Sequence, residues 1–163
     1  MAFLQTIRAA LALGLMAVPA VAAAQVAPAV PQTNTPSEIV PVEPANGAFV
    51  VPVVLNGVLA EKFIVDSGAA DVSIPADVAS TLKQSGTMTG TDFLGSKVYM
   101  MADGSKVPSQ IYRLASLRIG DMVMENVTVR IAAEKTHLLL GQSFLSRLRS
   151  WSMDNARQVM IFN

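Results

Sequence analysis

The stretch FIVDSGAADVSI, residues 63–74, places the carboxylate of Asp66 directly after an apolar run. Such a run is typical of a buried strand. A buried carboxylate is costly unless hydrogen bonds satisfy it, so the following Ser67 and Gly68 predict a tight polar loop. Taken alone, the stretch fits an Asx turn, in which Asp66 accepts backbone N–H hydrogen bonds. The rest of the sequence decides whether Asp66 also has a chemical role.

Two apolar segments lead into this loop. Residues 49–55 and 58–65 flank Asn56-Gly57, a dipeptide that favours the tight turn of a β-hairpin because both residues tolerate positive φ. The hairpin prediction places Asp66 at the exit of the second strand.

A short helix is predicted directly after the loop, over residues 75–83. A proline stands at its start and Gly86 follows its end, which is the usual asymmetry of helix termini. Its apolar residues Val78, Ala79 and Leu82 share one face. This face is therefore expected to pack on the core.

The rest of the chain consists of short apolar segments separated by turn residues. The segments predicted as strands are 98–101, 107–114, 117–119, 122–131, 138–140 and 159–162. Asp103-Gly104 and Gly120-Asp121 predict hairpin turns between neighbouring strands, and residues 142–148 predict a second short helix. Many short strands with one or two short helices predict a mainly β fold, a small closed or nearly closed β-barrel that hides its strand edges.

The composition excludes several classes of function. The 163 residues are 52% hydrophobic and 15% charged, as in a globular chain with a core. The sequence has no cysteine and one histidine, so disulfides and a Cys/His zinc site within one chain are excluded. With 12 basic and 12 acidic residues and no basic cluster, nucleic-acid binding is not expected.

The N-terminal part differs in character from the rest. Residues 1–24 contain an early Arg8, an apolar run and small residues ending at Ala24, a pattern that predicts a cleaved secretory signal peptide. Repeated prolines predict an extended linker over residues 25–46. Residues 47–163 then form the single predicted domain.

The signal peptide sets the expected location. Cleavage predicts an exported protein, in the bacterial periplasm. The alternative is an uncleaved segment that anchors the protein in the inner membrane, facing the periplasm. Membrane contact is expected only in that case.

Three elements of the sequence resemble a known family. Residues 63–69 are similar to the apolar-apolar-Asp-Thr/Ser-Gly-Ala signature of the aspartic proteases. Residues 139–141 with the following segment 142–148 resemble the second apolar-apolar-Gly loop and helix of the single-lobe, retropepsin-like branch. The Asp103-Gly104 hairpin lies between them, where that branch has its flap. The resemblance covers about residues 49–162, is greatest to bacterial exported or membrane-tethered members, and implies a retropepsin-like β-barrel.

The resemblance implies an aspartic endopeptidase that acts on a peptide or protein substrate without cofactor or metal. Its chemistry needs two neighbouring carboxylates, one as general base on a water and the other as general acid. The chain has a single Asp-Ser-Gly, at Asp66, and is too short for two lobes. The site would therefore be built by a homodimer, with Asp66 from each subunit on the two-fold axis.

The resemblance also implies roles for neighbouring residues. Ser67 would hydrogen-bond across the dimer, Gly68 would allow close backbone approach, and Gly141 would support the loop under Asp66. The substrate-binding positions would be Ala69 and Ala70, and the flap positions Ala102, Asp103 and Gly104. Serine stands where the family more often has threonine, and Ala70 where many members have a polar residue. Strand 159–162 would pair in the dimer interface or be an ordinary strand of the barrel.

Other chemistries fit the sequence less well. Ser143 lacks the Gly-x-Ser-x-Gly pattern of a serine hydrolase, and His137 is interpreted as a turn or edge residue. Asp71 and Asp92 are not part of a calcium-type loop. The open alternative is a binding module of the same fold that keeps Asp66 as a structural residue and recognises an envelope or partner peptide without cutting it.

Overall fold

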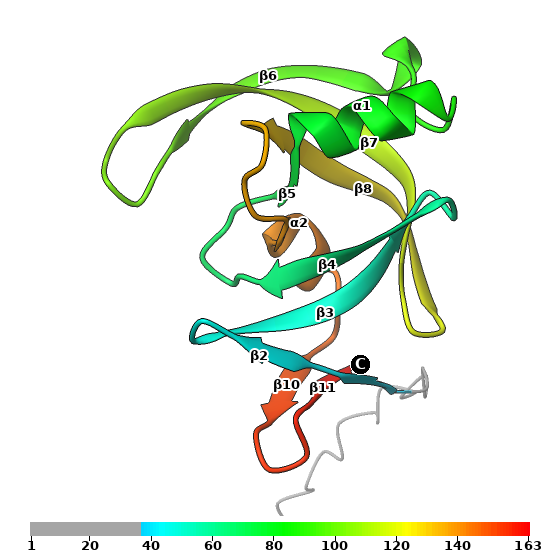
Figure 1. Cartoon of the computed structure of the whole chain (residues 1–163), viewed down its shortest axis with the longest axis vertical. Coiled ribbons are helices and arrows are strands. Elements are labelled where there is room, and N and C mark those ends of the chain that lie inside the picture. Colours follow the sequence, from blue (N-terminus) through cyan, green and yellow to red (C-terminus); the bar gives the residue numbers. More distant parts are fainter. Residues whose placement is uncertain (1–36) are drawn as a thin grey trace, which may run out of the picture. The chain divides into compact units, whose positions relative to one another are not determined.

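The computed structural model describes residues 37–163, a unit of short strands with two short helices (Figure 1). The predicted signal peptide, 1–24, and residues 25–36 of the predicted linker lie outside the described residues. The strands are β1 Glu38–Pro41, β2 Glu43–Ala45, β3 Ala48–Leu55, β4 Leu59–Val65, β5 Val72–Pro75, β6 Phe93–Met100, β7 Lys106–Ile119, β8 Met122–Ala132, β9 Leu139–Leu140, β10 Trp151–Asp154 and β11 Val159–Phe162. The helices are α1 Ala76–Gln84 and α2 Gln142–Leu145, with a 3-10 turn, η1, at Gly90–Asp92.

The larger sheet curves back on itself. Its strand order is β2-β3-β4-β9-β5-β8-β7-β6. In addition, β3 pairs with β7, where Val54 lies opposite Arg118 and Leu55 opposite Leu117. Figure 1 shows the β6–β7 hairpin curving away from the body of this sheet. The prediction of a mainly β, nearly closed sheet with short helices is confirmed.

The folded domain begins earlier than the predicted boundary at Gly47. Both β1 and β2 lie within the predicted linker, and Val40 and Val42 are buried in the core at 3% and 5% exposure. Pro41 and Pro44 are tolerated because their strands lie at sheet edges, where not every backbone N–H is needed. The end of the proline-rich segment is thus structural rather than linker.

The C-terminal strand is confirmed as β11 and lies in a small sheet of order β1-β11-β10. Met160 at its centre is paired with Val40 of β1 and Met153 of β10. Because strands of the same chain occupy both of its hydrogen-bonding edges, β11 is not free to pair with a second copy. Of the two roles that the sequence leaves open for this segment, the structure shows the ordinary strand of the fold.

The predicted turns and the first helix are in place. Asn56 and Gly57 have φ of 47° and 71°, the two positive values that a tight hairpin turn of type I′ requires. Helix α1 begins after Pro75 and ends at Gln84, and its buried residues are Val78, Ala79 and Leu82 as expected. The hairpin therefore places Asp66 directly after the end of β4.

Two strands are longer than predicted. Strand β6 begins at Phe93 rather than residue 98, and β7 continues unbroken to Ile119. The predicted segments 107–114 and 117–119 form one strand, because residues 115–116 between them are also extended and Ser116 pairs with Glu125 of β8. The flap hairpin is consequently built on a long, continuous two-stranded support.

Helix α2 is a single turn rather than the predicted residues 142–148. Phe144 and Leu145 are buried, and Leu148 packs against the core from outside the helix. The Phe144 ring packs edge to face against the Phe162 ring, with 6.2 Å between the ring centroids, so α2 is fixed between the larger sheet and β11.

No helix among residues 37–163 is long and apolar enough to cross a membrane.

Candidate active site

Asp66 is positioned by the strand pair beneath it. Strands β4 and β9 run parallel, with Val65 opposite Leu140, and the Asp66 N–H donates to the Leu140 carbonyl at 3.1 Å. The Asp66 Oδ1 accepts the Gly68 N–H at 2.9 Å. This is the Asx-type cap that the sequence predicts, and it fixes one oxygen of a half-buried carboxylate. Within the described residues, Oδ2 accepts no hydrogen bond.

Gly141 lies directly under the loop. A Cβ on this residue would collide with the carbonyl of Asp71 and lie 2.8 Å from the carbonyl oxygen of Ala69. The next two backbone N–H groups continue this contact, from Gln142 to the Ala69 carbonyl at 2.8 Å and from Ser143 to the Ala70 carbonyl at 3.1 Å. The loop after Asp66 is therefore held against the start of α2.

The remaining loop residues lie together around Asp66. Ser67 and Gly68 are exposed, and the Ser67 carbonyl accepts the Gln142 side-chain amide at 2.8 Å. Hydrogen bonds among the described residues leave the Ser67 hydroxyl unused. Ala69 is half-buried and Ala70 is exposed. The structure thus brings the predicted loop, support and substrate-binding positions into one small region.

The predicted flap residues form the tip of the β6–β7 hairpin. Ala102, Asp103 and Gly104 are exposed, Gly104 has φ of 82°, and its N–H donates to the Met101 carbonyl at 2.9 Å. Hydrogen bonds from Ser105 lower the pKa of Asp103 below its ordinary value; the side-chain bond has the larger effect and the backbone bond the smaller. No hydrogen bond within the described residues joins this tip directly to the Asp66 loop.

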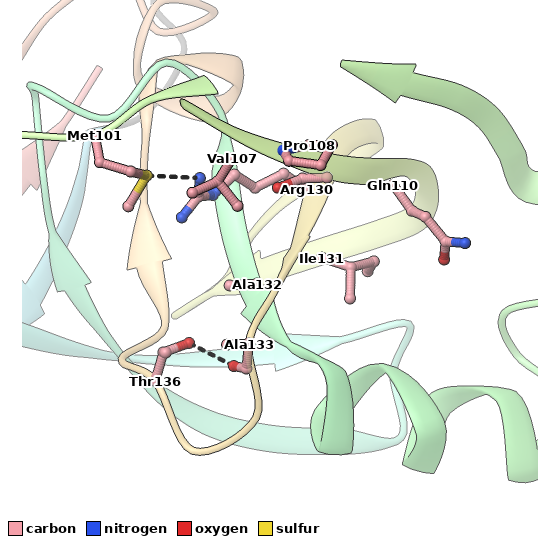
Figure 2. Close-up of a pocket in the computed structure, with 10 residues that line it drawn as sticks. Met101, Val107, Pro108, Gln110, Arg130, Ile131, Ala132, Ala133 and Thr136 are labelled. Atoms are coloured by element: carbon pink, nitrogen blue, oxygen red, sulfur yellow. Dashed lines mark hydrogen bonds between the residues drawn. The ribbon is translucent and has the colours of Figure 1, made fainter. Parts of the chain in front are cut away.

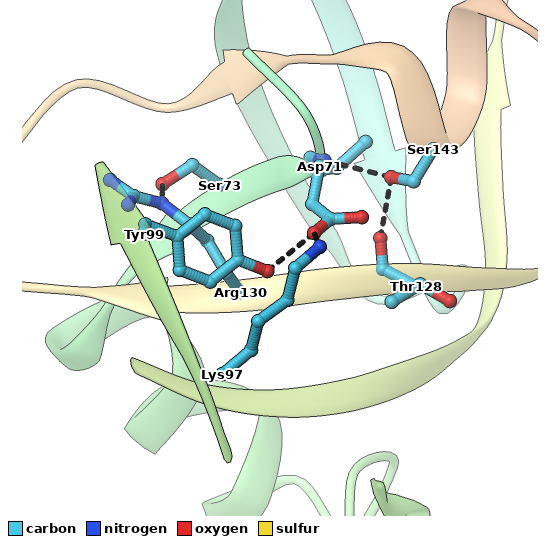
Figure 3. Close-up of polar contacts among 8 residues, drawn as sticks. Asp71, Ser73, Lys97, Tyr99, Thr128, Arg130 and Ser143 are labelled. Atoms are coloured by element: carbon cyan, nitrogen blue, oxygen red, sulfur yellow. Dashed lines mark hydrogen bonds and ion pairs between the residues drawn. The ribbon is translucent and has the colours of Figure 1, made fainter. Parts of the chain in front are cut away.

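The predicted flap hairpin, β6–β7, is instead joined to the segment after Asp66 through the Asp71 side chain (Figure 3). The Tyr99 hydroxyl, on β6, donates a hydrogen bond to the Asp71 carboxylate, and the Lys97 ammonium lies 3.4 Å from the same oxygen. Burial raises the pKa of Tyr99 above its ordinary value, and the hydrogen bond and negative charge of Asp71 add to this effect while Arg130 opposes it. Tyr99 therefore stays a neutral donor and ties the flap strand to the segment that follows Asp66.

Arg130 on β8 lies over the face of the Tyr99 ring. Its guanidinium carbon is 5.0 Å from the ring centroid, and its Nε donates to the buried Ser73 hydroxyl at 3.1 Å. Its Nη1 contacts the Met101 sulfur at 3.6 Å, near the flap tip. Arg130 thus connects β5, β6 and β8 beneath the flap.

These contacts involve residues that the sequence does not single out. Asp71 is not part of a calcium-type loop, and Tyr99, Lys97 and Arg130 belong to no motif. Tyr99 is 28 positions from Asp71 in sequence, so only the fold brings the two together. The signal that existed was Asp71 itself, a second carboxylate within the stretch around Asp66.

Metal binding has no support among the described residues. Within residues 37–163 no group of three or more histidine, cysteine, aspartate or glutamate side chains is placed to hold a metal ion.

The chain is similar to known proteins in sequence and in fold. Residues 51–147, more than half of the chain, match the family described as "gag-polyprotein putative aspartyl protease". The chain belongs to this aspartyl protease family. The matched residues of this chain include Asp66, the β6–β7 hairpin and Gly141.

A solved structure supports the same assignment. The crystal structure of a retropepsin-like aspartic protease from Rickettsia conorii is similar to this chain, with a TM-score of 0.59 and 25% sequence identity. The similarity covers 78% of this chain and 90% of that chain. The nearly closed sheet with two short helices is therefore a retropepsin-like fold. A comparison with curated proteins gave no match.

Proposed function

We propose that this member of the aspartyl protease family is an aspartic endopeptidase whose active site is completed by a second copy of the chain. The observation that carries the proposal is the placement of Asp66. Its backbone and Oδ1 are fixed by Leu140 and Gly68, while Oδ2 remains without a hydrogen bond in the described residues. A carboxylate that is rigidly held and has one free oxygen is suited to bind and activate a water.

The second copy supplies what one chain lacks. Of two carboxyl groups held close together, one keeps its proton and the other is ionised. The ionised Asp66 takes a proton from water as the water oxygen bonds to the peptide carbonyl carbon. Asp66 of the partner subunit protonates the carbonyl oxygen, which gives a tetrahedral diol. The first Asp66 then passes its proton to the leaving nitrogen, the C–N bond breaks, and a diol hydroxyl returns a proton to Asp66 of the partner subunit as the carboxylic acid forms. The free Ser67 hydroxyl is available for a hydrogen bond between the two loops.

The flap would close over a bound peptide. The β6–β7 hairpin already lies against the segment after Asp66 through the bond between Tyr99 and Asp71. A closed flap excludes water other than the attacking molecule and holds the peptide in an extended form. Ala69 and Ala70 would contact the peptide backbone beside Asp66.

The test is a single substitution in the full-length chain. Asp66→Asn is expected to reduce cleavage of an unfolded protein substrate by about a hundredfold or more, because general acid–base catalysis is lost. Circular dichroism should show an unchanged fold. The matched control is Asp121→Asn, an exposed carboxylate in the β7–β8 turn, which should cleave like the parent.

The outcomes separate the two candidate functions. Equal cleavage by the parent and Asp66→Asn contradicts the aspartyl mechanism. A parent chain that binds peptides without cutting them supports the alternative, a peptide-binding module in which Asp66 only caps its loop. The hydrogen bond from Gly68 to Asp66 is compatible with that alternative, because a purely structural aspartate would also make it.

We further propose that the reaction takes place in the bacterial periplasm, with an inner-membrane anchor as the alternative. Support comes from the signal-peptide pattern of residues 1–24. Fractionation of cells that produce the full chain distinguishes a soluble periplasmic protein from an anchored one.

A further inference from the structure

A cavity of about 480 Å³ opens beneath the flap hairpin, where β7 separates from β8 (Figure 2). The two strands are paired up to Ile111 and Arg130, beyond which β7 follows β6 into the flap and β8 continues beside β5. The walls between them are mainly apolar, formed by Met101, Val107, Pro108, Ile131 and Ala132. The cavity therefore lies between the flap and the chain that leads to β9.

Of the residues between 37 and 163 that line this cavity, Arg130 is the one that carries a charge. Its side chain is held in place by Ser73, Met101 and the face of the Tyr99 ring. Figure 2 shows its guanidinium beside Met101 and Val107. These contacts use Nε and one N–H of Nη1, so the other N–H groups of the guanidinium remain available to a ligand.

The charge of Arg130 is not neutralised by an ion pair. Among the described residues it forms no salt bridge with a carboxylate. The nearby Asp71 carboxylate is engaged by Lys97 and by the Tyr99 hydroxyl instead. This group of side chains therefore has a net positive charge, with the unpaired cation in the cavity.

We propose that the cavity is a substrate subsite that selects an acidic side chain, with Arg130 as its specificity-determining residue. A guanidinium held in a fixed orientation binds a carboxylate through two parallel hydrogen bonds, and the apolar walls accommodate the methylene groups of a glutamate. The inference rests on the proposed function, because the cavity lies beneath the hairpin that would close over the bound peptide. It adds a substrate class to the proposed reaction.

The preference can be measured without cleavage. Full-length Asp66→Asn chain is titrated with fluorescently labelled octapeptides in which a glutamate is placed at each position in turn, with glutamine and leucine versions of each. At one position glutamate should bind at least about tenfold more tightly than glutamine, since a charge-assisted bidentate contact is gained. Amidated and free-acid versions of the peptides show whether a terminal carboxylate binds in the same place.

Substitutions at Arg130 test which group reads the peptide. In the Asp66→Asn background, Arg130→Met should abolish the glutamate preference, and Arg130→Glu should reverse it in favour of a lysine peptide. A merely structural role for Arg130 predicts weaker binding of every peptide but no reversal. The matched control is Lys83→Met, because Lys83 also lies over a tyrosine ring, that of Tyr112 at 4.5 Å, but outside the cavity. It should keep the preference.

Each result decides the proposal. A glutamate preference that is lost in Arg130→Met and reversed in Arg130→Glu supports it. Equal binding of glutamate and glutamine peptides at every position overturns it, as does binding only of peptides with a free terminal carboxylate. A parent chain that cleaves peptides without acidic preference overturns the subsite and leaves the protease intact. An acidic preference in a chain that never cleaves keeps the subsite and overturns the protease.

Discussion

At the scale of single residues, the tightest packing in the candidate site surrounds Gly141. Its φ of −96° is open to any residue, so the backbone conformation does not require glycine here. What requires it is the close approach of the carbonyl groups of Ala69 and Asp71. These are backbone atoms of the loop that carries Asp66, and they cannot rotate away as a side chain can.

Gly141→Ala is therefore expected to lower the free energy of unfolding by about 1–3 kcal/mol, the usual cost of forcing a methyl group into a filled space. Urea unfolding measures this loss. If the mutant folds, cleavage should also fall, because the loop must move away from α2 and take Asp66 with it. Gly90→Ala is the control, since a Cβ there meets nothing within 4 Å. Two variants of equal stability would show that the loop adapts freely.

At the scale of elements, a part-buried hydrogen bond links the flap hairpin to the segment after Asp66. Tyr99 is 8% exposed and donates to Asp71, and β6 and β7 have few other polar links to the Asp66 loop among the described residues. Tyr99→Phe removes the hydroxyl and keeps the ring against Arg130. Hydrogen exchange of peptides covering residues 93–110 should become faster, while exchange of α1 stays unchanged.

The pH dependence follows from the raised pKa of Tyr99. The unfolded chain loses this proton near pH 10, and the folded chain holds it to higher pH, so the stabilisation is complete below pH 10 and declines above it. The difference in unfolding free energy between parent and Tyr99→Phe should therefore be constant up to about pH 9 and shrink above about pH 10. Tyr112→Phe, whose hydroxyl accepts Lys83 away from the flap, should leave flap exchange unchanged. Unaltered exchange in Tyr99→Phe would contradict this role.

Elements with local signals were predictable, and those set by distant contacts were not. Asn56-Gly57 specifies its hairpin because the turn needs positive φ at both positions, and asparagine and glycine are the residue types that adopt it. Strands β1 and β2 were not predicted because proline weakens local strand signals. They are ordered by pairing with β11 and β3 and by burial of Val40 and Val42 in the core. The same holds for the contact of Arg130 with Met101, which joins residues 29 positions apart.

At the scale of the whole molecule, the proposed chemistry depends on how many chains form one site. The sequence indicates a two-chain site because it holds one Asp-Ser-Gly. It leaves two roles open for residues 159–162, because an apolar strand has the same pattern whether its edges pair within the chain or with a partner. In the structure β1 and β10 pair with both edges of β11, so the strand edges of this small sheet that remain open among the described residues are those of β1 and β10.

Mixing subunits tests the two-chain site directly. If each site needs Asp66 from two parent chains, adding a ninefold excess of Asp66→Asn chain leaves about one parent chain in ten with a parent partner. The cleavage rate of a fixed amount of parent should then fall to about a tenth, and an equal amount of variant should halve it. Substrate is kept in large excess over protein so that inactive pairs do not deplete it. A rate that is unaffected by the variant at every ratio would show that one Asp66 suffices, and the paired-carboxylate mechanism would have to be abandoned.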